Sequence, residues 1–279
     1  MEWWKALRAH IFPSAPKDTD TPAPTTRLTP GTAVQLVGDS IILRRWARSL
    51  PPEFDPHVEV YERGGTTNYI LRSGKFALLT DPVEVRAEAI SLLDRLNGAL
   101  SAFNRNSHRV TGGAVLQISS TGGIQHSLHL ASSVVAVADM ELSASGQTFD
   151  AQGNPLMPSS PEPSYAQLCL ALAGAEEEVD DLLTYAGRAD NWYDLFKLHE
   201  SAVAVAGDPK IFASIVGPEA KRVGLLKYSA NLHRHRRPEP TPPGKSAPTP
   251  LAFEEARTVA LWLADVTLRF ALARRPPTV

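Results

Sequence analysis

The chain has little of three things that distinguish protein classes: cysteine, excess charge and long apolar runs. Cys169 is the single cysteine among 279 residues, so no disulfide can form within the chain, which favours a reducing compartment. The formal net charge of −2 gives no overall field that would attract nucleic acid or anionic lipid. No apolar run reaches the roughly 18–20 residues that span a bilayer, and the first twelve residues lack the apolar centre of a signal peptide. We therefore expect a cytoplasmic protein without membrane contact.

Motifs for nucleotide, cofactor or metal chemistry are also missing. Three glycine pairs occur, at 64–65, 112–113 and 122–123. None of them continues into Gly-Lys-Ser/Thr or into Gly-x-Gly-x-x-Gly, the loops that bind nucleotides. His126 and His129 are three apart on a predicted strand and so point to opposite faces, while His233 and His235 would need distant partners to hold zinc. The sequence therefore predicts no cofactor and no metal site.

One short block, VQLVGDSIIL at residues 34–43, resembles the nucleophile block of the GDSL hydrolases. Ser40 would be the nucleophile of such an enzyme. That family also needs an Asp and a His close together near its C-terminus, to orient and act as the general base. The C-terminal part of this chain contains no Asp-x-x-His, and strands do not alternate with helices as that fold requires. We therefore interpret Gly38 and Asp39 as a turn that ends a strand.

The N-terminal segment is expected to form a short tethered helix. Residues 1–12 carry one apolar stripe at helical spacing. The stripe consists of Trp3, Trp4, Leu7 and Ile11. Residues 13–31 are rich in proline and threonine and predict an extended linker. We expect the helix to dock on the body of the protein; the alternative is that Trp3, Trp4 and Leu7 contact a partner or a membrane surface.

Residues 32–150 predict an α+β domain. Short segments with alternating apolar residues, rich in β-branched and aromatic side chains, predict its strands. They cover residues 32–38, 41–46, 58–64, 67–73, 75–80, 114–120 and 124–142. The glycine pair at 64–65 predicts a hairpin turn, because such turns need positive φ angles. One long helix is predicted over 81–103, with Asp81 as its N-cap and Pro82 as its first residue.

The rest of the chain predicts helices only. Acidic or proline-led starts followed by apolar stripes mark six segments. They are residues 165–174, 176–188, 190–207, 208–216, 218–235 and 252–275. We expect a helical bundle over 164–275, with a proline-rich loop at 238–250. Since the strands come first and the helices follow, the predicted fold class is α+β, an antiparallel β-rich domain with one long helix followed by an all-α bundle.

The third of these helical segments mixes apolar and charged residues. Its start, DNWYDLFKLHE, predicts Asp190 or Asn191 as the N-cap. We interpret Trp192 as an anchor of the bundle core. Asp194 and Lys197 are expected to face solvent.

Positive charge is concentrated at one place in this nearly neutral chain. The segment KYSANLHRHRR, residues 227–237, ends the fifth helical segment, and Pro238 stops the helix. Helical spacing puts Lys227, Asn231 and Arg234 on one stripe. The helix dipole stabilises cations at a C-terminus, but this segment holds more of them than capping requires. We predict a binding surface formed by Lys227, Arg234, His235, Arg236 and Arg237.

Two family resemblances bear on this region. The order of the β-rich half, LLDRLNGAL, a second β pair, NWYDLFKLHE, SANLHRHRR and FEEARTVALWL resembles a set of uncharacterised bacterial proteins, over roughly residues 58–272, and implies no activity. The helical half also resembles HEPN domains, helical bundles that often act as metal-independent ribonucleases. Their signature is an arginine followed several positions later by a histidine. The resemblance implies Lys227, Asn231 and His233 as catalytic residues in a homodimer, with a lysine point charge in place of the planar arginine fork.

These observations lead to two hypotheses about function. The first is a bacterial binding or assembly protein without catalysis of its own, which contacts a nucleic acid or an acidic protein partner through residues 227–237. The alternative is a HEPN-like ribonuclease in which His233 acts as general acid or base. We favour the first, because the sequence supplies no complete reactive centre.

Overall fold

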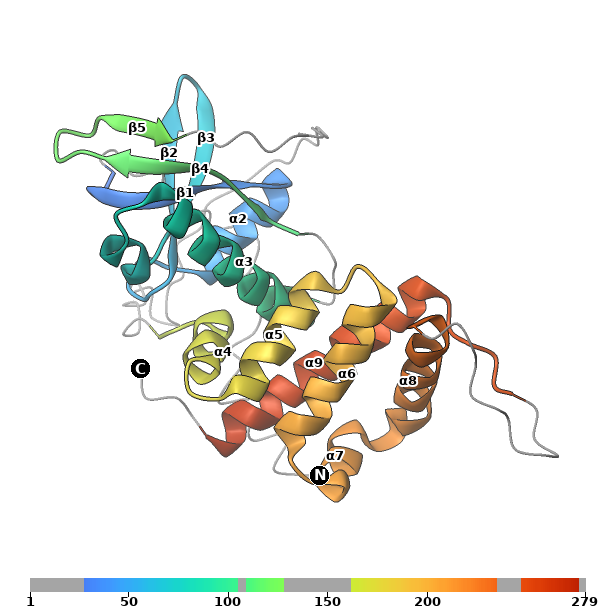
Figure 1. Ribbon diagram of the computed structural model, residues 1–279. Helices are drawn as coiled ribbons and strands as arrows, with labels where there is room; N and C mark the ends of the chain where they lie inside the picture. The colour runs from blue at the N-terminus through green and yellow to red at the C-terminus, as the bar shows by residue number, and fades with distance from the viewer. Residues whose placement is uncertain (1–27, 105–108, 128–161, 235–246, 276–279) are drawn as a thin grey trace, which may run out of the picture. The chain divides into compact units, whose positions relative to one another are not determined.

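The computed structural model describes residues 28–104, 109–127, 162–234 and 247–275 (Figure 1). The chain divides into two compact units, one formed by Met1–Val85 with Gly112–Ser164 and the other by Arg86–Thr111 with Tyr165–Val279. The predicted N-terminal helix, with Trp3, Trp4 and Leu7, lies outside the described residues, as does most of the proline-rich loop.

The first unit is built on a five-stranded antiparallel sheet. Its strands are β1 (Gly31–Val37), β2 (His57–Arg63), β3 (Thr66–Arg72), β4 (Thr111–Ile118) and β5 (Ile124–Ser127). They are ordered β2-β3-β1-β4-β5, with antiparallel registers between β2 and β3, β3 and β1, and β4 and β5. The side chain of Gln117 donates to Thr32 while Val37 lies against Gly113, so β1 and β4 also run in opposite directions. The predicted antiparallel β-rich part is confirmed.

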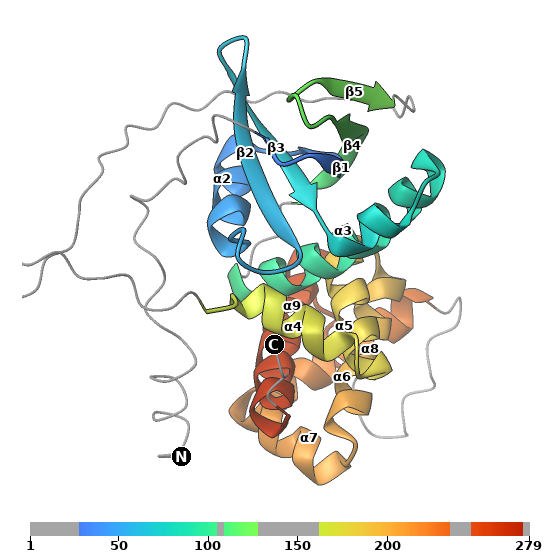
Figure 2. The same cartoon turned by 90° about the vertical axis from the view of Figure 1, so that its left-hand side faces the viewer.

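This sheet is strongly coiled. Its edge strands β2 and β5 would be about 19 Å apart in a flat sheet, because neighbouring strands lie about 4.8 Å apart. Nη1 of Arg63 on β2 nevertheless lies 3.4 Å from Nε2 of His126 on β5. Figure 2 shows the β2–β3 hairpin crossing the direction of β5. One face of the sheet carries an apolar cluster, which consists of Leu28, Ala33, Tyr61, Ile70, Ala114, Leu116 and Ile118, with Ile124 at its edge.

The strand predicted over 41–46 is wrong, because these residues lie in helix α2 (Ser40–Ser49). The carboxylate of Asp39 accepts hydrogen bonds from the backbone N–H groups of Ile41 and Ile42 and caps the helix. This cap and an apolar face at helical spacing override the β propensity of the Ile-Ile-Leu run. The buried residues of that face are Ile42, Leu43, Trp46 and Ala47.

The strand predicted over 75–80 is also wrong. The chain forms the 3-10 helix η1 (Gly74–Leu78) there, with Phe76 buried. The hydroxyl of Ser73 accepts a hydrogen bond from the N–H of Lys75 and begins the turn. A local side-chain cap again decides the backbone conformation.

Two other local predictions for this part of the chain are confirmed. Gly64 and Gly65 form the hairpin turn between β2 and β3, with φ angles of +60° and +77°. Helix α3 (Pro82–Asn104) begins as expected, and the carboxylate of Asp81 accepts from the N–H of Val83 at 2.8 Å.

The second unit consists of helices, most of α3 included. The others are α4 (Tyr165–Ala173), α5 (Glu177–Arg188), α6 (Trp192–Ala206), α7 (Pro209–Val216), η2 (Gly217–Glu219), α8 (Ala220–Arg234) and α9 (Phe253–Arg274). Both α6 and α9 contact α5, α7 and α8 as well as each other, and Figure 1 shows α9 passing behind α5 and α6. The predicted α+β class is therefore confirmed. No helix within the described ranges is long and apolar enough to cross a membrane.

Candidate functional site

The predicted binding surface lies at the end of α8, beside the start of α6 (Figure 1). Lys227, His233 and Arg234 are exposed, and Asn231 between them is partly buried. The remaining residues of the prediction, His235, Arg236 and Arg237, lie outside the described part of the chain.

Two exposed basic side chains of α8 lie over aromatic rings of α6. The guanidinium carbon of Arg234 is 3.9 Å from the centre of the Phe196 ring. The imidazole of His233 stacks on the indole of Trp192, with ring centres 4.4 Å apart and planes inclined by 14°. We call this set the basic–aromatic face; it consists of Trp192, Phe196, Lys227, His233 and Arg234. A cation–aromatic contact such as that of Arg234 with Phe196 contributes about 0.5–1 kcal/mol at an exposed site, which favours this side-chain position.

The start of α6 places the aromatic rings. Asn191 is the N-cap, and its side-chain oxygen accepts from the N–H of Asp194 at 3.0 Å. Trp192 and Phe196 are four residues apart and so lie on one stripe, which faces α8. Trp192 also meets the ring of Phe253 edge-on at 5.1 Å. It is partly buried, so it lies at the edge of the bundle core and not within it.

Asp194 was expected to face solvent, and that prediction is wrong. Its side chain is buried and accepts a hydrogen bond from the amide of Asn191 at 2.6 Å. Burial raises the pKa of the Asp194 carboxyl, which the Asn191 hydrogen bond and the nearby charge of Arg188 partly oppose. A carboxylate in the first turn can fold back onto its cap, which a helical wheel does not reveal.

A third stripe residue of α6, His199, is buried behind the basic–aromatic face. Its ring contacts Phe212 of α7 edge-on at 5.7 Å. Burial, with a smaller contribution from the positive charge of Lys227 and against the opposing effect of Glu200, lowers the pKa of His199 to about 4. Lys227 is therefore close enough to His199 to act on its ionisation.

The pKa of His199 predicts acid sensitivity of the helical unit. When folding lowers the pKa of a histidine, that histidine stabilises the folded protein at pH values above its unfolded pKa of 6.5. This stabilisation is lost as the pH falls towards 4. At 1.36 kcal/mol per pKa unit the loss is up to about 3 kcal/mol. Relative to His199→Leu, the wild-type protein is expected to lose this much unfolding free energy between pH 7 and pH 4 in urea titrations. Parallel pH profiles for the two proteins would contradict the assignment.

Two of the residues that the ribonuclease resemblance implies lie near different parts of α6. Lys227 acts on His199 in the middle of α6, whereas His233 stacks on Trp192 at the beginning of that helix. Seven residues of α6 separate these two contacts, about 10 Å along a helix that rises 1.5 Å per residue. The described residues thus present Lys227 and His233 as neighbours on a surface, with Arg234 between them in its contact with Phe196.

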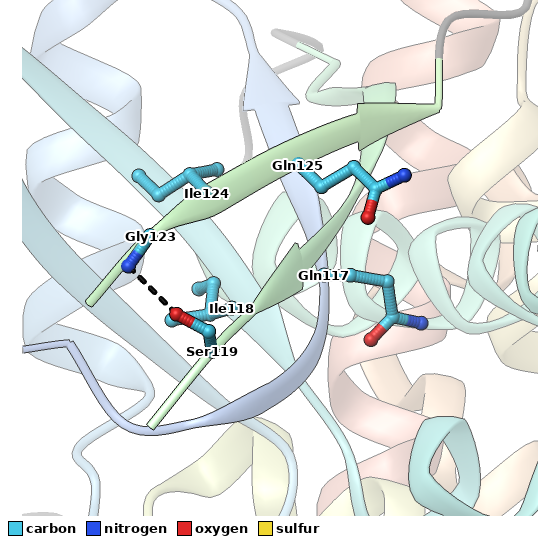
Figure 3. A pocket seen from close by; sticks show the side chains of 6 residues that line it. All are labelled: Gln117, Ile118, Ser119, Gly123, Ile124 and Gln125. Carbon is cyan, nitrogen blue, oxygen red and sulfur yellow. Dashed lines mark hydrogen bonds between the residues drawn. The ribbon is translucent and has the colours of Figure 1, made fainter. Parts of the chain in front are cut away.

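The first unit holds a hollow of about 490 Å³ beside the β4–β5 hairpin (Figure 3). Its lining residues are Gln117, Ile118, Ser119, Gly123, Ile124 and Gln125. Figure 3 shows Gln117 beside Gln125, and the Ser119 hydroxyl accepting from the N–H of Gly123 at 2.9 Å. Among the described residues, this lining contains no ionisable side chain.

Within the described residues, no group of three or more His, Cys, Asp or Glu side chains could hold a metal ion. His126 contacts Arg63 instead, and His129 lies outside the described residues.

Sequence analysis missed a second group of charged residues in the helical unit. It links α3, the residue Arg109, the α5–α6 connection and α9. Its members are Asp94, Arg109, Arg188, Asp190 and Arg257. They are scattered along the sequence without a common spacing, so no motif could have indicated that they meet.

Comparisons with protein-family profiles, with curated proteins and with solved structures gave no match for this chain. The resemblances to HEPN domains and to a bacterial family therefore remain predictions.

Proposed function

We propose that this protein binds single-stranded nucleic acid through the basic–aromatic face. The observation that carries the proposal is the pair of exposed basic side chains, with His233 stacked on Trp192 and Arg234 lying over Phe196. Proteins that bind single strands combine cations that follow the phosphates with flat rings on which bases stack. The end of α8 offers both within one turn of helix.

The His233 and Arg234 side chains are both exposed, so a ligand can approach them from solvent. A base can stack on the outer face of the His233 imidazole, and the edge of the Arg234 guanidinium carries N–H donors that suit phosphate oxygens. Lys227, two turns earlier on α8, adds a point charge. A double helix hides its base faces, so single strands are the better ligand for such a surface.

The proposal predicts a loss of binding when the basic side chains are neutralised. Arg234→Gln combined with Lys227→Gln is expected to weaken binding of a fluorescent single-stranded oligonucleotide at least tenfold at 100 mM salt, measured by anisotropy. Arg222→Gln is the control: it removes an exposed cation from α8 that already forms an ion pair with Glu219 at 3.2 Å. We expect this substitution to change the oligonucleotide affinity less than threefold.

The same samples separate binding from the alternatives. Wild-type protein is incubated with total RNA, with and without a chelator, beside His233→Ala. Binding without scission supports the proposal. Metal-independent scission that disappears in His233→Ala would replace it by the ribonuclease hypothesis. Absence of binding to RNA and to DNA single strands would overturn it and direct attention to an acidic protein partner.

A further inference from the structure

Five charged side chains form a chain of ion pairs at the α5–α6 connection of the helical unit. Asp94 of α3 accepts from Nε of Arg188 at 2.6 Å and also from Arg109. Arg109 continues to Asp190 at 3.4 Å, and Asp190 accepts from Nη2 of Arg257 on α9 at 3.1 Å. Positive and negative groups thus alternate from Arg188 to Arg257.

The two carboxylates in this chain of ion pairs differ in how firmly they are held. The Asp94 side chain is 3% exposed and lies within α3, so it pairs with Arg109 and Arg188 from a buried position. The Asp190 side chain is 51% exposed and belongs to the short connection between α5 and α6. An exposed ion pair contributes at most about 1 kcal/mol, so Asp190 can exchange with another anion.

We propose that Arg109 and Arg257 form a binding site for a phosphate group, which Asp190 closes with its own carboxylate. The two guanidinium groups already converge on one oxygen-bearing group and are fixed from behind, Arg109 by Asp94 and Arg257 by burial to 17% exposure. Nε of Arg257 is buried and makes no hydrogen bond in the described structure. A tetrahedral phosphate presents more acceptor oxygens than a carboxylate, and arginine forks suit it.

This site is independent of the proposed function, because other residues form it and it takes a single phosphate group, not the bases of a strand. The phosphate could be free in solution or belong to the end of a nucleic-acid strand. Both sources share the chemistry that Arg109 and Arg257 recognise, and the experiment separates them.

The test uses the full chain and isothermal titration with inorganic pyrophosphate. Asp190→Ala is expected to bind at least tenfold more tightly than wild type, because the competing carboxylate is gone. Adding Arg257→Gln to that variant is expected to abolish the gain. Glu254→Ala is the matched control: it removes an exposed acid that approaches Arg257 only to 3.9 Å, with the same change in net charge, and is expected to give no gain.

Short oligonucleotides with and without a 5′-phosphate complete the experiment. A gain for pyrophosphate alone assigns the site to a free anion, and a gain that requires the 5′-phosphate assigns it to a strand end. Either supports the site. Equal gains in Asp190→Ala and Glu254→Ala would reveal a general charge effect and overturn it, as would no gain in folded Asp190→Ala and Asp190→Asn proteins.

Discussion

Replacing Gly187 by alanine is expected to destabilise the helical unit by about 3 kcal/mol or more, although alanine is the better helix former. Helix propensity alone would make the substitution favourable by about 1 kcal/mol. At Gly187, however, a Cβ atom would lie 1.8 Å from the carbonyl oxygen of Asp94 and 3.0 Å from the backbone nitrogen of Gly98. Backbone atoms of a packed helix cannot move aside as a flexible side chain can. The steric cost of the added Cβ atom therefore exceeds the gain in helix propensity.

Thermal or urea unfolding followed by circular dichroism measures this effect. Gly224→Ala on α8 is the matched control, because nothing lies within 4 Å of a Cβ atom there. That variant is expected to equal or exceed wild type, by up to about 1 kcal/mol. If Gly187→Ala were as stable as Gly224→Ala, the close crossing of α3 and α5 would be refuted.

This crossing also matters for the proposed phosphate site. It brings Asp94 of α3 next to Arg188 at the end of α5, where the two side chains form their ion pair. A variant that separates the helices would therefore loosen Arg109 and Arg188 as well.

In the sheet unit, Glu59→Ala is expected to cost about 3–5 kcal/mol. Glu59 of β2 and Arg72 of β3 form a buried ion pair, with Nε 2.9 Å from the carboxylate. Glu59 also accepts from the N–H of Thr29, and Arg72 donates to the carbonyl oxygens of Thr29 and Thr32. Removing the acid leaves a buried guanidinium without its counter-charge, which is the costly half of breaking such a pair.

Two variants make this prediction specific. Glu62→Ala, on the same strand but exposed, is expected to change the unfolding free energy by less than about 0.5 kcal/mol. The double variant Glu59→Met with Arg72→Met is expected to be more stable than Glu59→Ala, since no buried charge remains. A Glu59→Ala protein with wild-type stability would show that the pair does not hold the start of β1 against β2 and β3.

Local patterns predicted the elements whose signals lie within a few residues. The helices of the second unit, the Asp81 cap and the Gly64–Gly65 turn each depend on adjacent residues, and the structure confirms them. Helix α2 was missed, because its β-branched start carried more weight than the cap at Asp39. The burial of Glu59 could not be predicted either. Side chains alternate along β2, so Glu59 lies on the opposite face from Val58 and Val60. Residues 28–32 cover that opposite face and bury Glu59.

The candidate site was predictable to the same extent. Helical spacing placed Lys227 and Arg234 on one stripe of α8, and both contribute to the surface described by the structure. That this stripe lies along Trp192 and Phe196 depends on how α6 packs against α8, and no spacing within either segment encodes that. The ion pairs of Asp94 and Asp190 depend on three helix contacts at once, so they were beyond any local pattern.

The salt dependence of single-strand binding tests the central claim most directly. The affinity of a fluorescent oligonucleotide is measured between 50 and 300 mM salt for wild type and for Lys227→Gln/Arg234→Gln. Each phosphate contact adds about 0.7 to the slope of log affinity against log salt concentration for single strands, so the double variant should lose about 1.4 from that slope. Parallel slopes for the two proteins, or binding that salt does not weaken, would contradict a nucleic-acid contact at the end of α8.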